Sequence, residues 1–167
     1  NACNLCHLDR SLAWTAAKLQ EWYSQPSPAM SQEQTNVSSA ALLLLTGDAG
    51  QRAVVAWNAG WSAAHAASAT DWLPPYLAQL LVDPYSVVRY IAARSLKTLP
   101  GHGGLDYDFI SHPARREEAR SKVRAFWQTQ KAAERPAAFV RPGGDLDEVE
   151  FGRLLQRRND RQMELLE

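Results

Sequence analysis

The chain has 167 residues, of which 46% are apolar and 22% charged, a composition that favours a packed core and argues against a disordered chain. Eighteen basic and eighteen acidic residues give a net charge of zero. This balance argues against a general nucleic-acid binder, which displaces counterions with an excess of positive charge. No apolar run approaches the roughly 20 residues of a membrane-spanning helix, so we expect no membrane span in this chain.

Apolar residues recur at helical spacing through the first half of the chain, and the alternation typical of strands is nearly absent. The spacing predicts helices over residues 9–23, 31–47 and 49–64. Pro26 ends the first helix because proline lacks an amide donor. Ser31 and Gln34 are typical of a capping box at the start of the second, which Gly47 ends. Asp48 is a suitable N-cap for the third.

Three further helices are predicted to begin near residues 70, 83 and 112. Pro74 fits the first turn of the first of these, where the missing amide donor matters least. Pro100 and Gly101 end the second, and the third runs to about residue 133. Residues 135–145 are rich in proline and glycine and are predicted to form an extended arm, followed by a short helix near residues 146–157.

The predicted helices form an internal repeat. The second and third make one hairpin and the fourth and fifth another, with Val55 in the first matching Ile91 in the second. Such pairs stack side by side because each buries what its neighbour cannot bury alone. The sequence therefore predicts an all-α fold, a short stack of antiparallel helical hairpins with an extended C-terminal arm.

Residues 77–96 resemble a HEAT repeat, in which Asp83 and Pro84 close the turn and Val88 and Arg89 open the second helix. The resemblance implies a HEAT-like α-solenoid. The first pair departs from the pattern, because no proline follows its turn aspartate and no arginine stands at the matching place.

Both cysteines lie in Cys3-Asn4-Leu5-Cys6-His7, which has the Cys-x-x-Cys-His spacing of a c-type haem attachment sequence. Two thiols three positions apart can add to the two vinyl groups on one edge of a porphyrin. The adjacent histidine then supplies an axial nitrogen to the iron. The motif therefore predicts haem c as cofactor, with Cys3 and Cys6 as anchors and His7 as the proximal ligand of the haem iron.

Other interpretations of the cysteine pair remain open. A thioredoxin-like redox motif requires a βαβ context, which the sequence lacks. A zinc site requires two more ligands, for which His102 and His112 are available. A structural disulfide or a pair of thiols without haem is expected if the protein is made in a cytoplasm.

The segment from Asn4 to Thr15 resembles the last haem-binding segment of bacterial multihaem c-type cytochromes, and the resemblance continues through residues 47–53 and 83–89 and, more weakly, 157–161. It implies a periplasmic or otherwise exported electron carrier whose earlier haem motifs precede this chain. It also implies Cys3 and Cys6 as thioether anchors and His7 as proximal ligand, with the distal ligand supplied by the preceding region.

Several other polar and aromatic residues are candidates for a site. His65, His102 and His112 each have a structural interpretation, at a helix end, in an exposed glycine-rich loop and near a helix start. Asp106 and Asp108 belong more naturally to a loop than to an acid–base pair. The six tryptophans fit helix faces, although Trp61 and Trp72 flank a loop and are candidates to line a groove; the basic residues of 115–124 alternate with acids, as on a solvated helix face.

These observations divide the chain into a haem attachment segment (1–8), a helical repeat domain (9–134) and a charged C-terminal arm (135–167). We expect the C-terminal part of an exported multihaem cytochrome that transfers electrons, with upstream haem domains and a redox or scaffold protein as partners. The alternative is a helical-repeat interaction module without haem. No nucleic acid partner and no enzymatic activity of these residues are expected.

Overall fold

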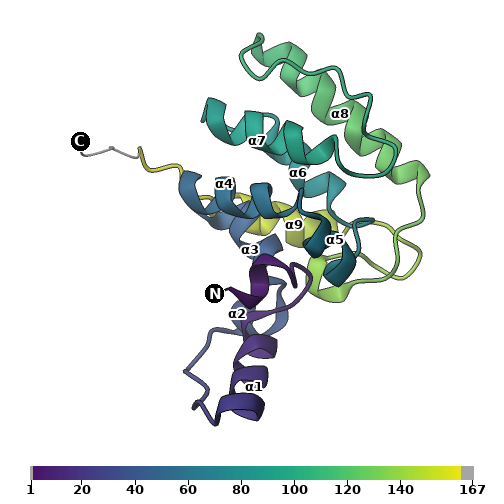
Figure 1. Ribbon diagram of the computed structural model, residues 1–167. Helices are drawn as coiled ribbons and strands as arrows, with labels where there is room; N and C mark the ends of the chain where they lie inside the picture. The colour runs from purple at the N-terminus through teal and green to yellow at the C-terminus, as the bar shows by residue number, and fades with distance from the viewer. Residues whose placement is uncertain (1, 163–167) are drawn as a thin grey trace.

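A computed structural model describes residues 2–162 of the chain (Figure 1). The described helices are η1 (a 3-10 helix, Cys3–Leu5), α1 (Leu12–Tyr23), α2 (Gln32–Asn36), α3 (Ser39–Thr46), α4 (Ala49–Asn58), α5 (Ser62–Ser68), α6 (Pro74–Leu80), α7 (Ser86–Leu96), α8 (Pro113–Thr129), η2 (a 3-10 helix, Pro136–Ala138) and α9 (Glu148–Leu155). Over the same residues, β-pairing is limited to isolated bridges from Val140 to Arg135 and to Leu146. The all-α prediction is confirmed. None of these helices is both long and apolar enough to cross a membrane.

Several helices begin at the predicted capping residues. Ser31 and Gln34 form the capping box of α2, in which the Gln34 amide donates to Ser31 Oγ over 3.2 Å. Asp48 forms a second capping box at the start of α4. Pro74 lies in the first turn of α6. These starts are local features of the sequence, which is why pattern alone locates them.

Two predicted helices are each broken into two. The helix predicted from residue 31 to 47 is interrupted where Val37 takes up an extended backbone and the Ser38 hydroxyl accepts from the Ala41 amide to start α3. The helix predicted over 49–64 ends early, and Trp61 is extended before α5 begins. At this break Gly60 approaches α7 so closely that a Cβ would lie 2.8 Å from Ser95 Oγ.

We expect Gly60→Ala to lower the free energy of unfolding by about 1–3 kcal/mol, because the added methyl group would overpack the contact with Ser95. Gly152 in α9 is the matched control, since a Cβ there meets no atom within 4 Å. Gly152→Ala should stabilise the protein by about 0.5–1 kcal/mol through its higher helix propensity. Urea unfolding followed by circular dichroism measures both changes. Effects of the same sign at the two glycines would contradict the proposed close approach.

The two predicted hairpins pack side by side. α3 lies against α4 and α6 against α7, and between the pairs α3 contacts α6 and α4 contacts α7 (Figure 1). α8 covers the remaining face of α6. α1 and α2 pack on each other and project from this body (Figure 1). The repeat of two helical pairs therefore exists in three dimensions.

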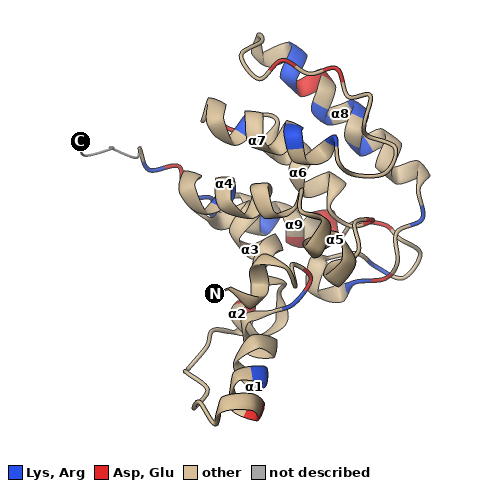
Figure 2. Ribbon diagram, in the orientation of Figure 1, with Lys and Arg blue, Asp and Glu red and all other residues tan. Residues whose placement is uncertain are grey.

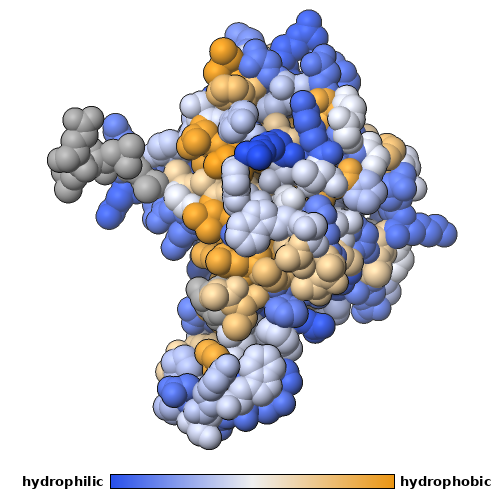
Figure 3. Space-filling view, viewed as in Figure 1, coloured by the Kyte–Doolittle hydropathy of each residue, from blue (hydrophilic) through white to orange (hydrophobic). Residues whose placement is uncertain are grey.

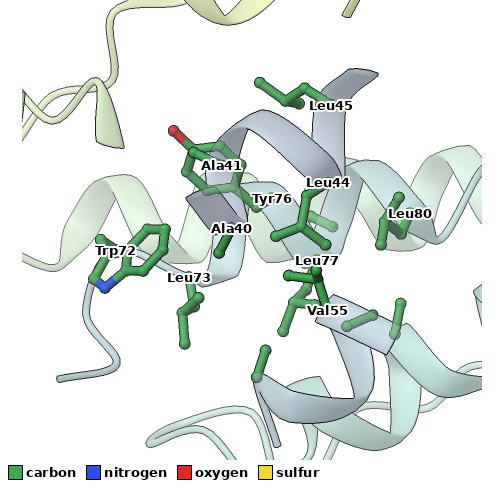
Figure 4. Packing of buried hydrophobic residues seen from close by; sticks show 14 of the residues in the cluster. Ala40, Ala41, Leu44, Leu45, Val55, Trp72, Leu73, Tyr76, Leu77 and Leu80 are labelled. Carbon is green, nitrogen blue, oxygen red and sulfur yellow. The ribbon is translucent and has the colours of Figure 1, made fainter. Parts of the chain in front are cut away.

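The core lies where α3, α4 and α6 meet. Leu44 of α3, Val55 of α4 and Leu77 of α6 converge there (Figure 4), each 4% exposed or less. Trp72 and Tyr76 extend this core toward the C-terminal segment, and their rings meet edge to face at 5.6 Å between centroids. Burial of this apolar surface is the main source of stability.

A buried ion pair joins the two hairpins. The Arg52 guanidinium on α4 donates to both carboxylate oxygens of Asp83, over 2.7 and 3.2 Å, and both side chains are fully buried. Arg52 also donates to the backbone carbonyls of Gly47 and Asn159. Arg89 donates to the Asp83 carbonyl from the other side. The first pair therefore does contribute a buried arginine, although Arg52 lies one position before the place at which the repeat pattern requires it.

The segment predicted as an extended C-terminal arm packs on the helical body over most of its described length. Ala138, Val140, Leu146, Phe151 and Leu154 are all buried. The Tyr76 hydroxyl, itself buried with its pKa raised by desolvation, donates to the Ala138 carbonyl. α9 contacts α3. The sequence did not predict this packing of the C-terminal segment, because residues 111–167 are highly charged and their apolar residues are few and widely spaced.

Candidate haem attachment site

The Cys-x-x-Cys-His motif forms a single helical turn. Cys3, Asn4 and Leu5 make up η1, and the amides of Cys6 and His7 donate to the Cys3 carbonyl over 3.3 and 2.9 Å. Residues three apart on such a turn lie on the same face. Both cysteines are half-buried and are not joined in a disulfide. The turn therefore presents the two thiols along one side, with the imidazole next in the chain.

Contacts far apart in the sequence hold this turn against the body. The Ser68 hydroxyl at the end of α5 accepts from the Leu8 amide over 2.9 Å and donates to the Cys6 carbonyl. Leu8 is fully buried in the core. A hydroxyl that bridges two backbone groups in this way satisfies both, which would otherwise be buried without partners.

Asn4, one of the two residues between the cysteines, ties the turn to α1. It is buried, its amide donates to the Arg10 carbonyl over 3.0 Å, and its carbonyl oxygen accepts from the Thr15 hydroxyl over 2.8 Å. The Ser39 amide at the start of α3 donates to the same Arg10 carbonyl. The motif is thus fixed to α1, α3 and α5 rather than left as a loose end.

His7 packs against Trp14 of α1, with ring centroids 4.8 Å apart and planes inclined by 49°. The guanidinium of Arg10, which precedes α1, lies 5.8 Å from the centroid of the Trp14 ring. Ring contact restricts the rotation of the imidazole. Trp14 therefore positions His7. From the sequence alone, Trp14 was predicted only to lie on a helix face.

The donor set fits haem attachment. The turn provides two thiols, which can form thioether bonds, and one imidazole, which can bind iron. An apolar cavity of about 290 Å³ borders the turn and is lined by Leu5, Leu12 and Leu43 among others, but not by the cysteines or His7. The two thiols and the imidazole therefore lie at the edge of the turn and outside this cavity. A haem held by these three side chains would not be enclosed by the residues that line this cavity.

The structure does not bring the other histidines to the cysteines. His65 Nε2 lies 2.8 Å from the Ala59 carbonyl, and His112 accepts from the Ala114 amide as the N-cap of α8. His102, expected in an exposed loop, is instead buried edge to face against Phe126, and this burial lowers the pKa of its imidazole.

Two of the other interpretations of the cysteine pair find no matching geometry in the described chain. Within residues 2–162 no three His, Cys, Asp or Glu side chains are placed to hold a metal ion together, so the four ligands of a zinc site are not assembled. The same residues contain no βαβ unit of the thioredoxin type.

The remaining candidates are accounted for by the fold. Trp72 is fully buried and its indole donates to the Ser68 carbonyl, so it does not line a groove, whereas Trp61 is 41% exposed. Asp108 accepts from the Ile110 amide within its loop. Three of the five basic residues of α8 pair with acids three or four positions away: Arg115 and Lys122 with Glu118, and Arg120 with Glu117. Arg124 pairs with Glu148 of α9 instead.

No family model, no curated protein and no solved structure matches this chain. The features of this chain that indicate a function are therefore the motif and the contacts that surround it.

Proposed function

We propose that this chain carries a haem c, anchored through thioether bonds at Cys3 and Cys6 and coordinated by His7, and that it belongs to a multihaem electron carrier of the periplasm or another exported location. The observation that carries the proposal is the Cys-x-x-Cys-His spacing on one helical turn. When bound, haem supplies one-electron chemistry. The described chain would hold the two thiols in place and orient the imidazole.

Within this proposal, different parts of the fold have different roles. The hydrogen bonds of Ser68 and Asn4 fix the turn, and Trp14 orients His7. The helical pairs, which we propose form a short HEAT-like stack, would serve as a rigid scaffold. The projecting α1 leaves Trp22 and Tyr23 58% and 67% exposed, an apolar end that suits contact with the upstream haem region.

Covalent haem retention tests the proposal. The chain should be exported to a periplasm that contains the haem maturation machinery, and then unfolded and separated on a denaturing gel stained for haem. We expect the wild-type chain to retain haem and the Cys3→Ala/Cys6→Ala variant to lose all of it, because only thioether bonds survive unfolding. His65→Gln is the matched control and should retain haem. A wild-type chain with normal helicity and no covalent haem would overturn the proposal.

A second candidate is a protein-docking module that acts without haem. It is favoured by large hydrophobic side chains that remain exposed on neighbouring helices, among them Trp57 and Trp61 at 41% each and Tyr90 at 47%. Such side chains are enriched where proteins bind one another. Normal binding of a partner by a chain unable to attach haem would establish this second function.

A further inference from the structure

Two helices that lie side by side present matching apolar edges to solvent. On α4, Val54 and Trp57 lie three positions apart, and Trp61 follows in the extended turn before α5. On α7, Val87 and Tyr90 are also three positions apart, and Arg94 follows one turn later. Helical spacing places Val54 and Trp57 along one edge of α4, and Val87, Tyr90 and Arg94 along one edge of α7. We call the two sets together the α4–α7 face. Its apolar members are 41–56% exposed, and hydrophobic side chains gather over this region in Figure 3.

The two edges are joined by a stacked cation. The Arg94 guanidinium lies 4.5 Å from the centroid of the Trp57 ring, so the side chain crosses from α7 to α4. Trp57, Trp61 and Arg94 line a cavity of about 220 Å³, whose floor includes Gly60 and Ser95. The close approach of Gly60 to Ser95 brings the two helices together at this point. The face therefore has a hollow with aromatic walls and a cation at its edge.

Carboxylates are absent from the elements that build this face. Residues 49–70 and 84–105 contain no aspartate or glutamate, and over residues 2–162 Arg94 forms no ion pair. α8 is different, because Arg115, Arg120 and Lys122 each pair with a glutamate of the same helix (Figure 2). An arginine stacked on an indole keeps its N–H edge available for a carboxylate. The charge of the face is thus complementary to an acidic ligand.

We propose that the α4–α7 face binds an acidic peptide segment of a partner protein, with a carboxylate on Arg94 and an apolar side chain in the hollow beside Trp57 and Trp61. The inference deepens the docking candidate above and does not depend on haem. A second copy of the same face is disfavoured, because a symmetric contact would enclose two Arg94 side chains in an interface whose elements contain no carboxylate to pair with them. Arg94 and Lys97 alone are too few cations for a nucleic acid or an anionic membrane.

An array of short peptides tests the proposal with the full chain. Each peptide carries several glutamates and one Leu, Phe or Trp, and its matched partner has every Glu replaced by Gln. We expect binding by fluorescence anisotropy at low salt, weakened about tenfold by the Gln replacement and weakened further as salt rises. Arg94→Gln and Trp57→Ala should each weaken binding about tenfold.

Control variants test whether peptide binding is specific to the α4–α7 face. Arg115→Gln on α8 and Trp22→Ala on α1 remove an exposed side chain of the same type and should leave binding unchanged. All variants should keep wild-type circular dichroism. The Cys3→Ala/Cys6→Ala variant should bind normally, which distinguishes a failure of docking from a failure of haem attachment. Wild-type binding to none of the peptides, equal binding by Arg94→Gln, or a preference for anionic vesicles or self-association would each overturn the proposal.

Discussion

Asp83→Ala is expected to lower the free energy of unfolding by about 3–5 kcal/mol, the range for removing one partner of a buried ion pair. The large effect follows from what would remain. Arg52 is fully buried, and without the Asp83 carboxylate its charge would be left with backbone carbonyls and the half-exposed Asp160, 3.4 Å away. Urea unfolding monitored by circular dichroism measures the change.

A surface pair provides the comparison. Lys18 and Glu21 form an ion pair on α1 in which the Glu21 side chain is 58% exposed. Glu21→Ala should therefore change the free energy of unfolding by less than about 1 kcal/mol. The double variant Arg52→Met/Asp83→Leu should recover much of the loss, because buried ion pairs can often be replaced by apolar residues of similar volume. A loss at Asp83 no larger than that at Glu21 would show that the buried pair is not a major link between the hairpins.

The Arg52–Asp83 ion pair could be predicted only in part from the sequence. The HEAT resemblance implies that Asp83 closes the turn of the second hairpin, and an Asp-Pro step is itself typical of a turn. Its partner was not predicted, since Arg52 lies 31 positions away and nothing in the surrounding residues distinguishes a buried arginine from a solvated one. The helix breaks at Val37 and Gly60 were missed for a similar reason. Helical periodicity continues through both, and the close approach of Gly60 to α7 at the second break is visible only in the fold.

The candidate site shows the same division. The motif is recognised from five consecutive residues, because its chemistry depends on the spacing of two thiols and an imidazole. The surroundings of the motif depend on side chains that arrive from elsewhere. Ser68 is 62 positions from Cys6, and Thr15 is 11 positions from Asn4. An isolated serine in an alanine-rich segment gives no signal of such a role, so the anchoring of the turn could be found only from the fold.

Phe151→Ala is expected to lower the free energy of unfolding by about 3–5 kcal/mol, as for other buried aromatic residues cut back to alanine. Phe151 is 2% exposed, packs on Tyr76 of α6 with ring centroids 5.2 Å apart, and lies under the Arg124 guanidinium of α8. Its removal would open a cavity between α9 and the helical body. Thermal or urea unfolding measures the loss.

The same experiment distinguishes the two descriptions of the C-terminal segment. Val149 also lies on α9 but is 73% exposed, so Val149→Ala should change stability by no more than about 0.5 kcal/mol. An extended arm that stands apart from the body would tolerate both substitutions equally. A large loss at Phe151 alone requires that α9 unfolds together with α6. Residues 135–155 would then belong to the cooperative unit that supports the N-terminal turn, since α9 contacts α3 and the α3 start contacts Arg10.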